Sequence, residues 1–138
     1  MVKICVMDGQ GGNLGRQLAK LIGERFPDAE LMVVGTNSMA TANMMKAGVT
    51  AAATGENAVI VACRKVDIIV GPIGLVIADA LMGEVTPAMA IAVGQSPAQR
   101  VLIPMNRCDT YIAGVENMTV SALIEDGLRH VERLLSGR

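Results

Sequence analysis

A carboxylate and four glycines follow the first apolar segment of the chain, in an order that suits the binding of an anion. Asp8 comes directly after the apolar run that ends at Met7. Where glycines lie between a strand and a helix, backbone amides can approach a ligand, and the helix N-terminus favours negative charge. The alternative is a tight strand-to-helix turn that binds nothing. We favour a site for phosphate or another anion, lined by Gly9, Gln10, Gly11, Gly12, Asn13 and Gly15.

Three roles are open to Asp8. A carboxylate beside a phosphate repels it unless a cation intervenes or the group points elsewhere. Asp8 can orient the turn by accepting hydrogen bonds from backbone amides, which is the role we favour. It can instead hold a Mg²⁺ between protein and phosphate, or act as a catalytic carboxylate. Glu56 is the second catalytic candidate, and its simpler interpretation is a first-turn residue that stabilises a helix N-terminus.

Small, amide, hydroxyl and charged residues follow the other predicted strands as well. In an open α/β sheet, ligands bind beyond the carboxyl ends of the strands. Arg107 is the candidate to clamp a phosphate or carboxylate with its guanidinium, and an exposed loop arginine is the alternative. Asn37 is placed to reach a sugar. The residues at these strand ends that we expect to contact a ligand are Thr36, Asn37, Gly71, Pro72, Asn106 and Arg107.

The apolar segments predict an α/β fold in which strands and helices alternate. Such alternation implies a mostly parallel sheet with right-handed crossovers. We expect one Rossmann-like domain, 1–138, in three layers, with five parallel strands in the order 3-2-1-4-5 and a sixth at the edge. The strands are expected at Val2–Val6, Glu30–Val34, Val49–Ala53, Val66–Val70, Arg100–Ile103 and Tyr111–Val115. The helices are expected at Asn13–Phe26, Ser38–Ala47, Glu56–Arg64, Leu75–Met82, Thr86–Val93 and Val120–Leu135.

The charge and aromatic content argue against nucleic acid as a partner. The chain carries 12 basic and 13 acidic residues, a net charge of −1, and no basic run. Phosphate backbones need a basic surface, and unpaired bases need stacking platforms. Phe26 and Tyr111 are the two aromatic residues. We therefore expect a small anionic ligand as the partner.

Cysteine usage and hydropathy bear on compartment and assembly. Cys5, Cys63 and Cys108 form no CxxC pair, so no metal site is indicated, and an odd count without a leader segment fits the cytoplasm. The apolar region 68–93 contains Asp79, Glu84, prolines and glycines, so no membrane span is expected. Charged residues make up 18% of the chain and hydrophobic residues 51%. So few charges cannot cover the surface of a small protein, and a homo-oligomer, in the simplest case a homodimer, is expected.

Five segments together resemble a short bacterial protein family of unknown function over nearly the whole chain. The resemblance implies a Rossmann-like fold and a cytoplasmic protein, and it supplies no activity. A more local likeness to NAD(P)-binding Rossmann proteins covers about the first 35 residues. The second strand ends in Gly35-Thr36-Asn37, without the carboxylate that holds the ribose of NAD. The five segments are 4–12, 35–37, 53–57, 71–74 and 104–108.

Three functional hypotheses follow from these residues. The leading one is a nucleotide- or phosphometabolite-binding protein, with NAD(P) as the specific candidate and an unknown reaction. The second is an enzyme acting on a small acid or phosphorylated metabolite, with Asp8 or Glu56 as base and Arg107 as clamp. The third is a non-catalytic regulatory or interaction module that acts as a homo-oligomer through methionine-rich helices.

Overall fold

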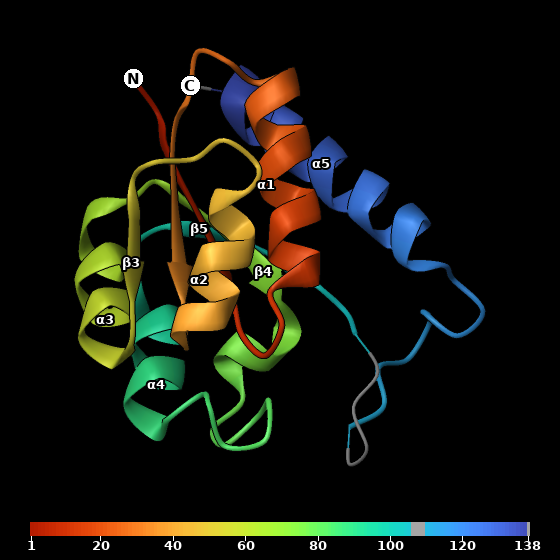
Figure 1. Ribbon diagram of the computed structural model, residues 1–138. Coiled ribbons are helices and arrows are strands. Elements are labelled where there is room, and N and C mark those ends of the chain that lie inside the picture. The colour runs from red at the N-terminus through yellow and green to blue at the C-terminus, as the bar shows by residue number, and fades with distance from the viewer. Residues whose placement is uncertain (106–109, 138) are drawn as a thin grey trace.

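The computed structural model describes residues 1–105 and 110–137, and its centre is a five-stranded parallel sheet (Figure 1). The strand order is β3-β2-β1-β4-β5, as the sequence predicted. β1 lies in the middle and pairs with both β2 and β4. Its end, Asp8, therefore lies at the centre of the carboxyl edge. The strands are β1 (Lys3–Asp8), β2 (Glu30–Gly35), β3 (Ala52–Thr54), β4 (Ile68–Pro72) and β5 (Gln99–Ile103).

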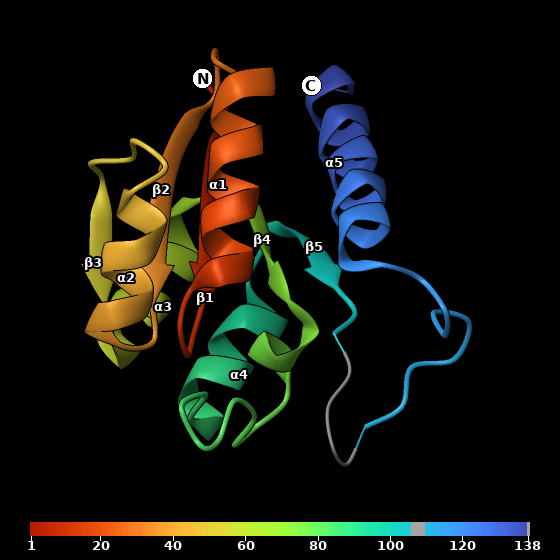
Figure 2. The ribbon, with the colours of Figure 1, turned by 45° about the vertical axis from the view of Figure 1, so that its right-hand side comes forward.

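Helices cover both faces of this sheet and complete the predicted three-layer Rossmann-like α/β fold (Figure 2). Side chains alternate along β1, so that Ile4 and Val6 enter one core and Cys5 and Met7 enter the other. A strand covered on both faces is apolar throughout, which explains why the sequence reveals β1 so clearly. One face carries α1 (Asn13–Arg25), α2 (Ser38–Met45) and α5 (Val120–Ser136), and the other carries α3 (Glu56–Lys65) and α4 (Pro87–Gln95).

The predicted sixth strand at Tyr111–Val115 is wrong. The part of the sheet that the structure describes has five strands, and residues 111–119 run through turns. Gly114 has a φ of +88°, which breaks an extended run, and the Tyr111 side chain is 90% exposed. The apolar residues of this segment therefore do not mark a strand. The other predicted elements, apart from the helix at Leu75–Met82, agree in type, with bounds within about three residues.

The predicted helix at Leu75–Met82 is also wrong. A short 3₁₀ turn, η1 (Ile73–Val76), is followed by an irregular segment, here called the 77–86 loop. Asp79, Leu81 and Met82 have positive φ angles of 66°, 56° and 56°, so the chain reverses instead of continuing as a helix. Because Leu81 is only 4% exposed, the loop is folded back onto the protein. The apolar residues that suggested a helix are in part the anchors of this loop.

Composition led us to expect no membrane span and a homo-oligomer, and the surface of the described residues is relevant to both. No helix among them is long and apolar enough to cross a membrane. Several large apolar side chains are exposed, among them Met39, Met82 and Ile91. Such residues are compatible with self-association, which stays a prediction.

The glycines at the start of α1 allow close approach of α1 to α2. Gly12, the residue before the helix, has a φ of +76°, and a Cβ there would lie 2.7 Å from the carbonyl oxygen of Ala40. A Cβ on Gly15 would lie 2.5 Å from Met44 Sδ and 2.7 Å from the Cβ of Asp8. Because Asp8 belongs to the central strand, it cannot move aside. These two glycines are therefore explained by packing.

Replacing Gly15 by alanine should destabilise the protein by about 1–3 kcal/mol, because the added methyl overpacks the contact with Asp8 and Met44. The matched control is Gly23→Ala on the same helix, where a Cβ would lie 3.8 Å from Leu31. That variant should gain up to about 1 kcal/mol from helix propensity. Urea unfolding of both variants measures the difference. Equal stability changes would contradict the packing explanation.

Candidate functional site

The candidate site lies at the carboxyl edge of the sheet, where the turns after β1 and β2 meet the 77–86 loop (Figure 1). The chain leaves β1 toward β2 on one side, and β4 and β5 lie on the other side. The ends of β1 and β4 thus flank the point where ligands bind in open α/β sheets. The Thr36 amide donates to the Asp8 carbonyl at 3.0 Å and holds the first two turns together.

Asp8 is built into the turn after β1. Its carboxylate accepts a hydrogen bond from the Gly9 amide at 2.8 Å and another from the Gly15 amide at 2.7 Å. The residue is only 6% exposed. These are the backbone hydrogen bonds of the orienting role that we favoured for Asp8. Its roles as a Mg²⁺ ligand and as a catalytic carboxylate stay predictions.

Glu84, which the sequence analysis did not select, lies at the centre of the candidate site. Its Oε1 atom accepts hydrogen bonds from the backbone amide of Gln10 at 2.8 Å, from Thr36 Oγ1 at 2.7 Å and from Asn37 Nδ2 at 2.7 Å. We call these three groups the donor cluster. They come from two different turns, and all of them meet one oxygen atom. The arrangement therefore holds one anionic oxygen, that of the Glu84 carboxylate, by three hydrogen bonds.

The hydrogen bonds of the donor cluster lower the pKa of Glu84. Partial burial, the largest single influence, raises the pKa, but the bonds from Thr36, Gln10 and Asn37 together outweigh it. The pKa of Glu84 is therefore lowered from its ordinary value of 4.5. The carboxylate is ionised at neutral pH, and the cluster holds its charged form.

Asn37 and Asn43 fix the donor cluster in place. Asn37 Oδ1 accepts a hydrogen bond from the Ala40 amide at 2.8 Å and so caps the N-terminus of α2. Asn37 Nδ2 also donates to the backbone carbonyl of Gln10 at 3.0 Å. Asn43 Nδ2 donates to the Gly11 carbonyl at 2.8 Å. The Asn37 amide group, predicted to reach a sugar, is thus engaged within the protein.

The four glycines of the turn have different neighbours. A Cβ on Gly9 would lie 2.6 Å from Thr36 Oγ1 and 3.0 Å from Glu84 Oε1, so Gly9 leaves room for the donor cluster and its occupant. Among the described residues, a Cβ on Gly11 would meet only Asn13 Nδ2, at 3.7 Å. Gly12 and Gly15 serve the packing of α1, as described above. The turn is therefore partly a binding feature and partly a packing feature.

Among the described residues, the predicted site residues Glu56, Gly71 and Pro72 are not among the hydrogen-bond partners of Glu84 Oε1. Glu56 Oε1 accepts from Thr86 Oγ1 at 2.8 Å, which ties the end of the 77–86 loop to the start of α3. Gly71 and Pro72 are buried at the end of β4, and Gly71 lies against the Met7 carbonyl. Asn106 and Arg107 lie outside the described residues. Among the described residues, no group of three His, Cys, Asp or Glu side chains is placed to hold a metal.

One feature of the sequence indicates Glu84, namely its position as a charged residue within an apolar region. Within the apolar region 68–93, Asp79 and Glu84 are the two charged residues. An isolated carboxylate in such a region needs polar partners, because burial of a charge is costly. The pattern could have indicated Glu84, but it could not have indicated Thr36 and Asn37 as the partners, since they lie 48 and 47 positions away.

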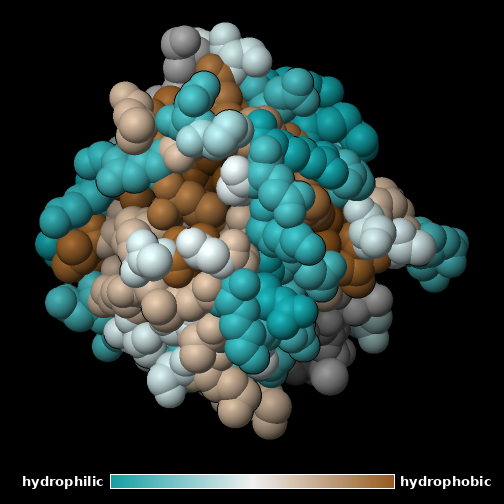
Figure 3. Space-filling model, turned by 45° about the horizontal axis from the view of Figure 1, so that its top comes forward, coloured by the Kyte–Doolittle hydropathy of each residue, from teal (hydrophilic) through white to brown (hydrophobic). Residues whose placement is uncertain are grey.

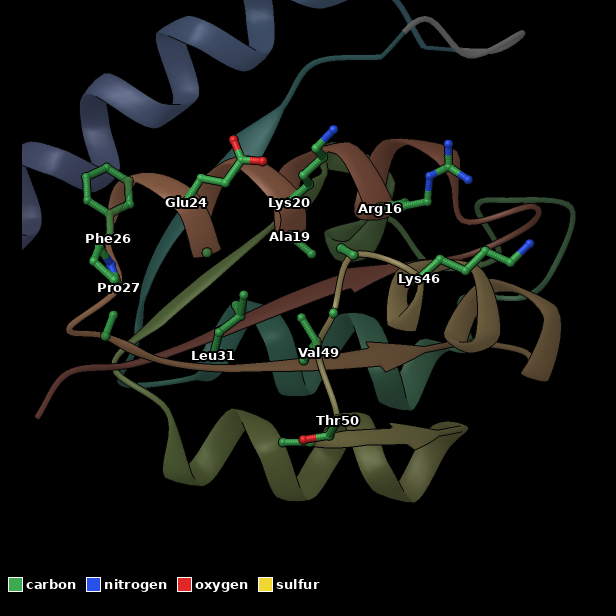
Figure 4. A pocket seen from close by; sticks show the side chains of 15 residues that line it. Arg16, Ala19, Lys20, Glu24, Phe26, Pro27, Leu31, Lys46, Val49 and Thr50 are labelled. Carbon is green, nitrogen blue, oxygen red and sulfur yellow. The ribbon is translucent and has the colours of Figure 1, made fainter.

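A groove with a volume of about 680 Å³ lies on the α1 side of the molecule (Figure 4). It lies between α1 and residues 46–51, with Leu31 and Val49 among its apolar lining. Arg16, Lys20 and Lys46 lie around its rim. Figure 3 shows apolar surface on this side, bordered by hydrophilic side chains. No residue of the donor cluster lines this groove.

Comparison with known proteins places the chain in a family. A family model described as a domain of unknown function, DUF3842, matches residues 3–136. The chain belongs to the DUF3842 family. This agrees with the resemblance to a family of unknown function, whereas the likeness to NAD(P)-binding proteins is not shown. No curated protein matches this DUF3842 chain.

A solved structure is similar in fold to the DUF3842 chain. It is the crystal structure of a dodecameric FMN-dependent UbiX-like decarboxylase from Escherichia coli O157:H7. The TM-score is 0.47 and the sequence identity 19%, covering 96% of this chain and 75% of that chain. Similarity at this level gives no indication of ligand, reaction or assembly.

Replacing Asp8 by asparagine should destabilise the protein by about 1–3 kcal/mol, because the asparagine amide cannot accept from both the Gly9 and Gly15 amides. Asp28→Asn, in the exposed turn before β2, is the control for loss of one carboxylate. Chemical denaturation measures both. If Asp8→Asn is as stable as the control, the orienting role is wrong.

The Glu84 pKa predicts a pH-dependent contribution to stability. Since the folded-state pKa is lowered, the contribution is present above the ordinary value of 4.5 and is lost as pH falls through the folded-state pKa. The stability advantage of the wild-type chain over Glu84→Gln should therefore be larger at neutral pH than in acid. Denaturation at a series of pH values tests this. An advantage that does not change with pH would contradict it.

Proposed function

We propose that this DUF3842 protein binds a small molecule with an anionic group, of the nucleotide or phosphorylated-metabolite class, at the donor cluster. The observation that carries the proposal is the convergence of Gln10 N–H, Thr36 Oγ1 and Asn37 Nδ2 on one carboxylate oxygen. Three positioned donors that hold a carboxylate oxygen can also hold a phosphate oxygen, because both accept charge-assisted hydrogen bonds.

The helices next to the donor cluster support an anionic ligand. α1 and α2 begin directly after the two turns that supply the donors. Each helix N-terminus carries a partial positive charge from its aligned peptide dipoles, and this charge stabilises a nearby anion. The donors themselves are uncharged, so the ligand's charge would be balanced by dipoles and hydrogen bonds.

NAD(P) is a less well supported member of this ligand class. Thr36 and Asn37 follow the end of β2, where an NAD-binding protein has a carboxylate for the ribose hydroxyls. We therefore expect a simpler phosphorylated ligand to be favoured over a dinucleotide. The proposal makes no statement on a reaction, and a homo-oligomer remains compatible with it.

The direct test is a titration followed by NMR. Inorganic phosphate, AMP, ATP, NAD, NADP and FMN are added at millimolar concentrations, with and without Mg²⁺. Binding should shift the signals of Gln10, Thr36 and Asn37, whereas binding in the groove would shift those of Lys20 and Thr50. No shift at the donor cluster, in either the wild-type chain or Glu84→Gln, would overturn the proposal.

Gly9→Ala should weaken binding by about tenfold or more, because its Cβ would occupy the space beside Thr36 Oγ1 and Glu84 Oε1. The matched control is Gly11→Ala, whose Cβ would lie at an ordinary contact distance from Asn13 Nδ2. Isothermal titration of folded protein, checked by circular dichroism, measures the affinities. Equal affinities for the two variants would place the ligand elsewhere.

A further inference from the structure

We propose that Glu84 is a built-in competitor for the anionic ligand, and that the 77–86 loop must release it before the ligand binds. This inference rests on the proposed function, and it concerns how the same site is regulated. It follows from what occupies the donor cluster, from how the occupant is held, and from the backbone conformation of the loop.

Glu84 and an anionic ligand need the same hydrogen atoms. The backbone amide of Gln10 and the hydroxyl of Thr36 each have a single hydrogen, and both donate it to Glu84 Oε1. Asn37 Nδ2 has two, and the second one goes to the Gln10 carbonyl. A ligand oxygen can therefore take these donors only if Oε1 leaves. Occupation by Glu84 and by ligand is mutually exclusive.

The Glu84 carboxylate is held through one oxygen. Among the described residues, Oε2 has no hydrogen-bond partner, while Oε1 has three. No lysine or arginine forms an ion pair with it in that part of the chain. Release of Glu84 therefore breaks one cluster of bonds and leaves no buried cation unpaired, since the ligand would then satisfy the same donors.

The backbone before Glu84 is strained when the loop is closed. Leu81, Met82 and Gly83 form a run of left-handed residues, with φ angles of 56°, 56° and 88°. Left-handed conformation is unfavourable for Leu and Met, so other contacts must hold it. The Gly83 amide donates to the Asp79 carbonyl at 3.1 Å, and the Glu84 backbone amide donates to the Leu81 carbonyl at 3.2 Å. The side-chain hydrogen bonds of Glu84, which follows the run directly, add to this restraint. Once a ligand takes the donors, Met82 and Gly83 lose the restraint that the Glu84 side chain provides, while Leu81 stays buried.

The rest of the loop supplies a fixed base for such a motion. Leu81 is 4% exposed and Val85 is fully buried, while Met82 at the tip is 93% exposed. The Asp79 amide donates to the Val85 carbonyl at 2.7 Å, and the Val85 amide to the Ala80 carbonyl at 3.1 Å. The base of the loop is therefore anchored on both sides of the tip, and the motion can be confined to residues 82–84.

Electrostatic repulsion between Glu84 and an anionic ligand favours the release of Glu84 when the ligand binds. A phosphate that approached the donor cluster while Glu84 was bound would meet a carboxylate at contact distance, which is repulsive. Departure of Glu84 removes this charge from the site. By linkage, a ligand that binds only the open form shifts the loop toward that form, and a change that opens the loop without obstructing the donors raises the affinity.

The decisive experiment compares three variants in isothermal titrations with inorganic phosphate and with AMP. Glu84→Gln and Glu84→Ala should bind about tenfold more tightly than the wild-type chain, because the competitor is weakened or removed. Asp79→Asn is the matched control: it removes a carboxylate from the same loop, at an exposed position where asparagine tolerates the positive φ. Its affinity should equal that of the wild-type chain.

Hydrogen exchange provides an independent readout in the wild-type protein. Saturating AMP should increase amide exchange at residues 82–84, since the ligand releases the tip of the loop. If AMP instead protects this segment, the loop closes over the ligand and the inference is overturned. Glu84→Gln retains the size of the side chain, so it serves as the test if Glu84→Ala does not fold.

The remaining outcomes separate this inference from the proposed function. If the Glu84 variants bind more weakly than the wild-type chain, Glu84 contacts the ligand, and competition is wrong. If they bind equally well, Glu84 only braces the loop, and the inference is wrong while the proposed function stands. If neither ligand binds the wild-type chain or either Glu84 variant, the proposed function itself fails for these ligands.

Discussion

The carboxylate of Asp8 is the contact on which the candidate site depends. It accepts hydrogen bonds from the Gly9 amide and the Gly15 amide, and so joins the end of the central strand to the first turn of α1. Because β1 pairs with strands on both sides, its end is fixed by the whole sheet. The turn between these two amides therefore has little conformational freedom, and the backbone N–H of Gln10 points in a defined direction.

The donor cluster follows from this fixed turn and from the close packing of two helices. Gly12 and Gly15 lack side chains where α1 meets Ala40 and Met44, so α2 can begin next to the turn after β1. Asn37 begins α2 and reaches back to the Gln10 carbonyl. The glycine spacing that suggests a phosphate-binding turn thus acts largely through packing, which brings donors from two turns to one point.

The sequence predicted the sheet better than the site. Buried strands are continuous apolar runs, and amphipathic helices such as α5 have regular spacing, so both leave local patterns. The 77–86 loop does not, because its conformation depends on positive φ angles and on contacts with distant turns. Leu81 and Val85 look like part of a helix in sequence, but they anchor a loop. An isolated carboxylate in an apolar region could indicate Glu84 itself, but its partners Thr36 and Asn37 belong to another part of the chain and leave no local pattern.

The position of two carboxylates at an edge suited to anions has a consistent electrostatic explanation. A cluster of backbone and side-chain donors at two helix N-termini carries positive potential. Leaving these donors without an acceptor and out of contact with water would cost free energy. Asp8 satisfies the inner amides permanently, because it is 6% exposed and held at two points. Glu84 satisfies the outer donors from a strained loop, through a single oxygen. One carboxylate therefore belongs to the fold, whereas the other occupies the position at which we propose that a ligand of the same charge binds.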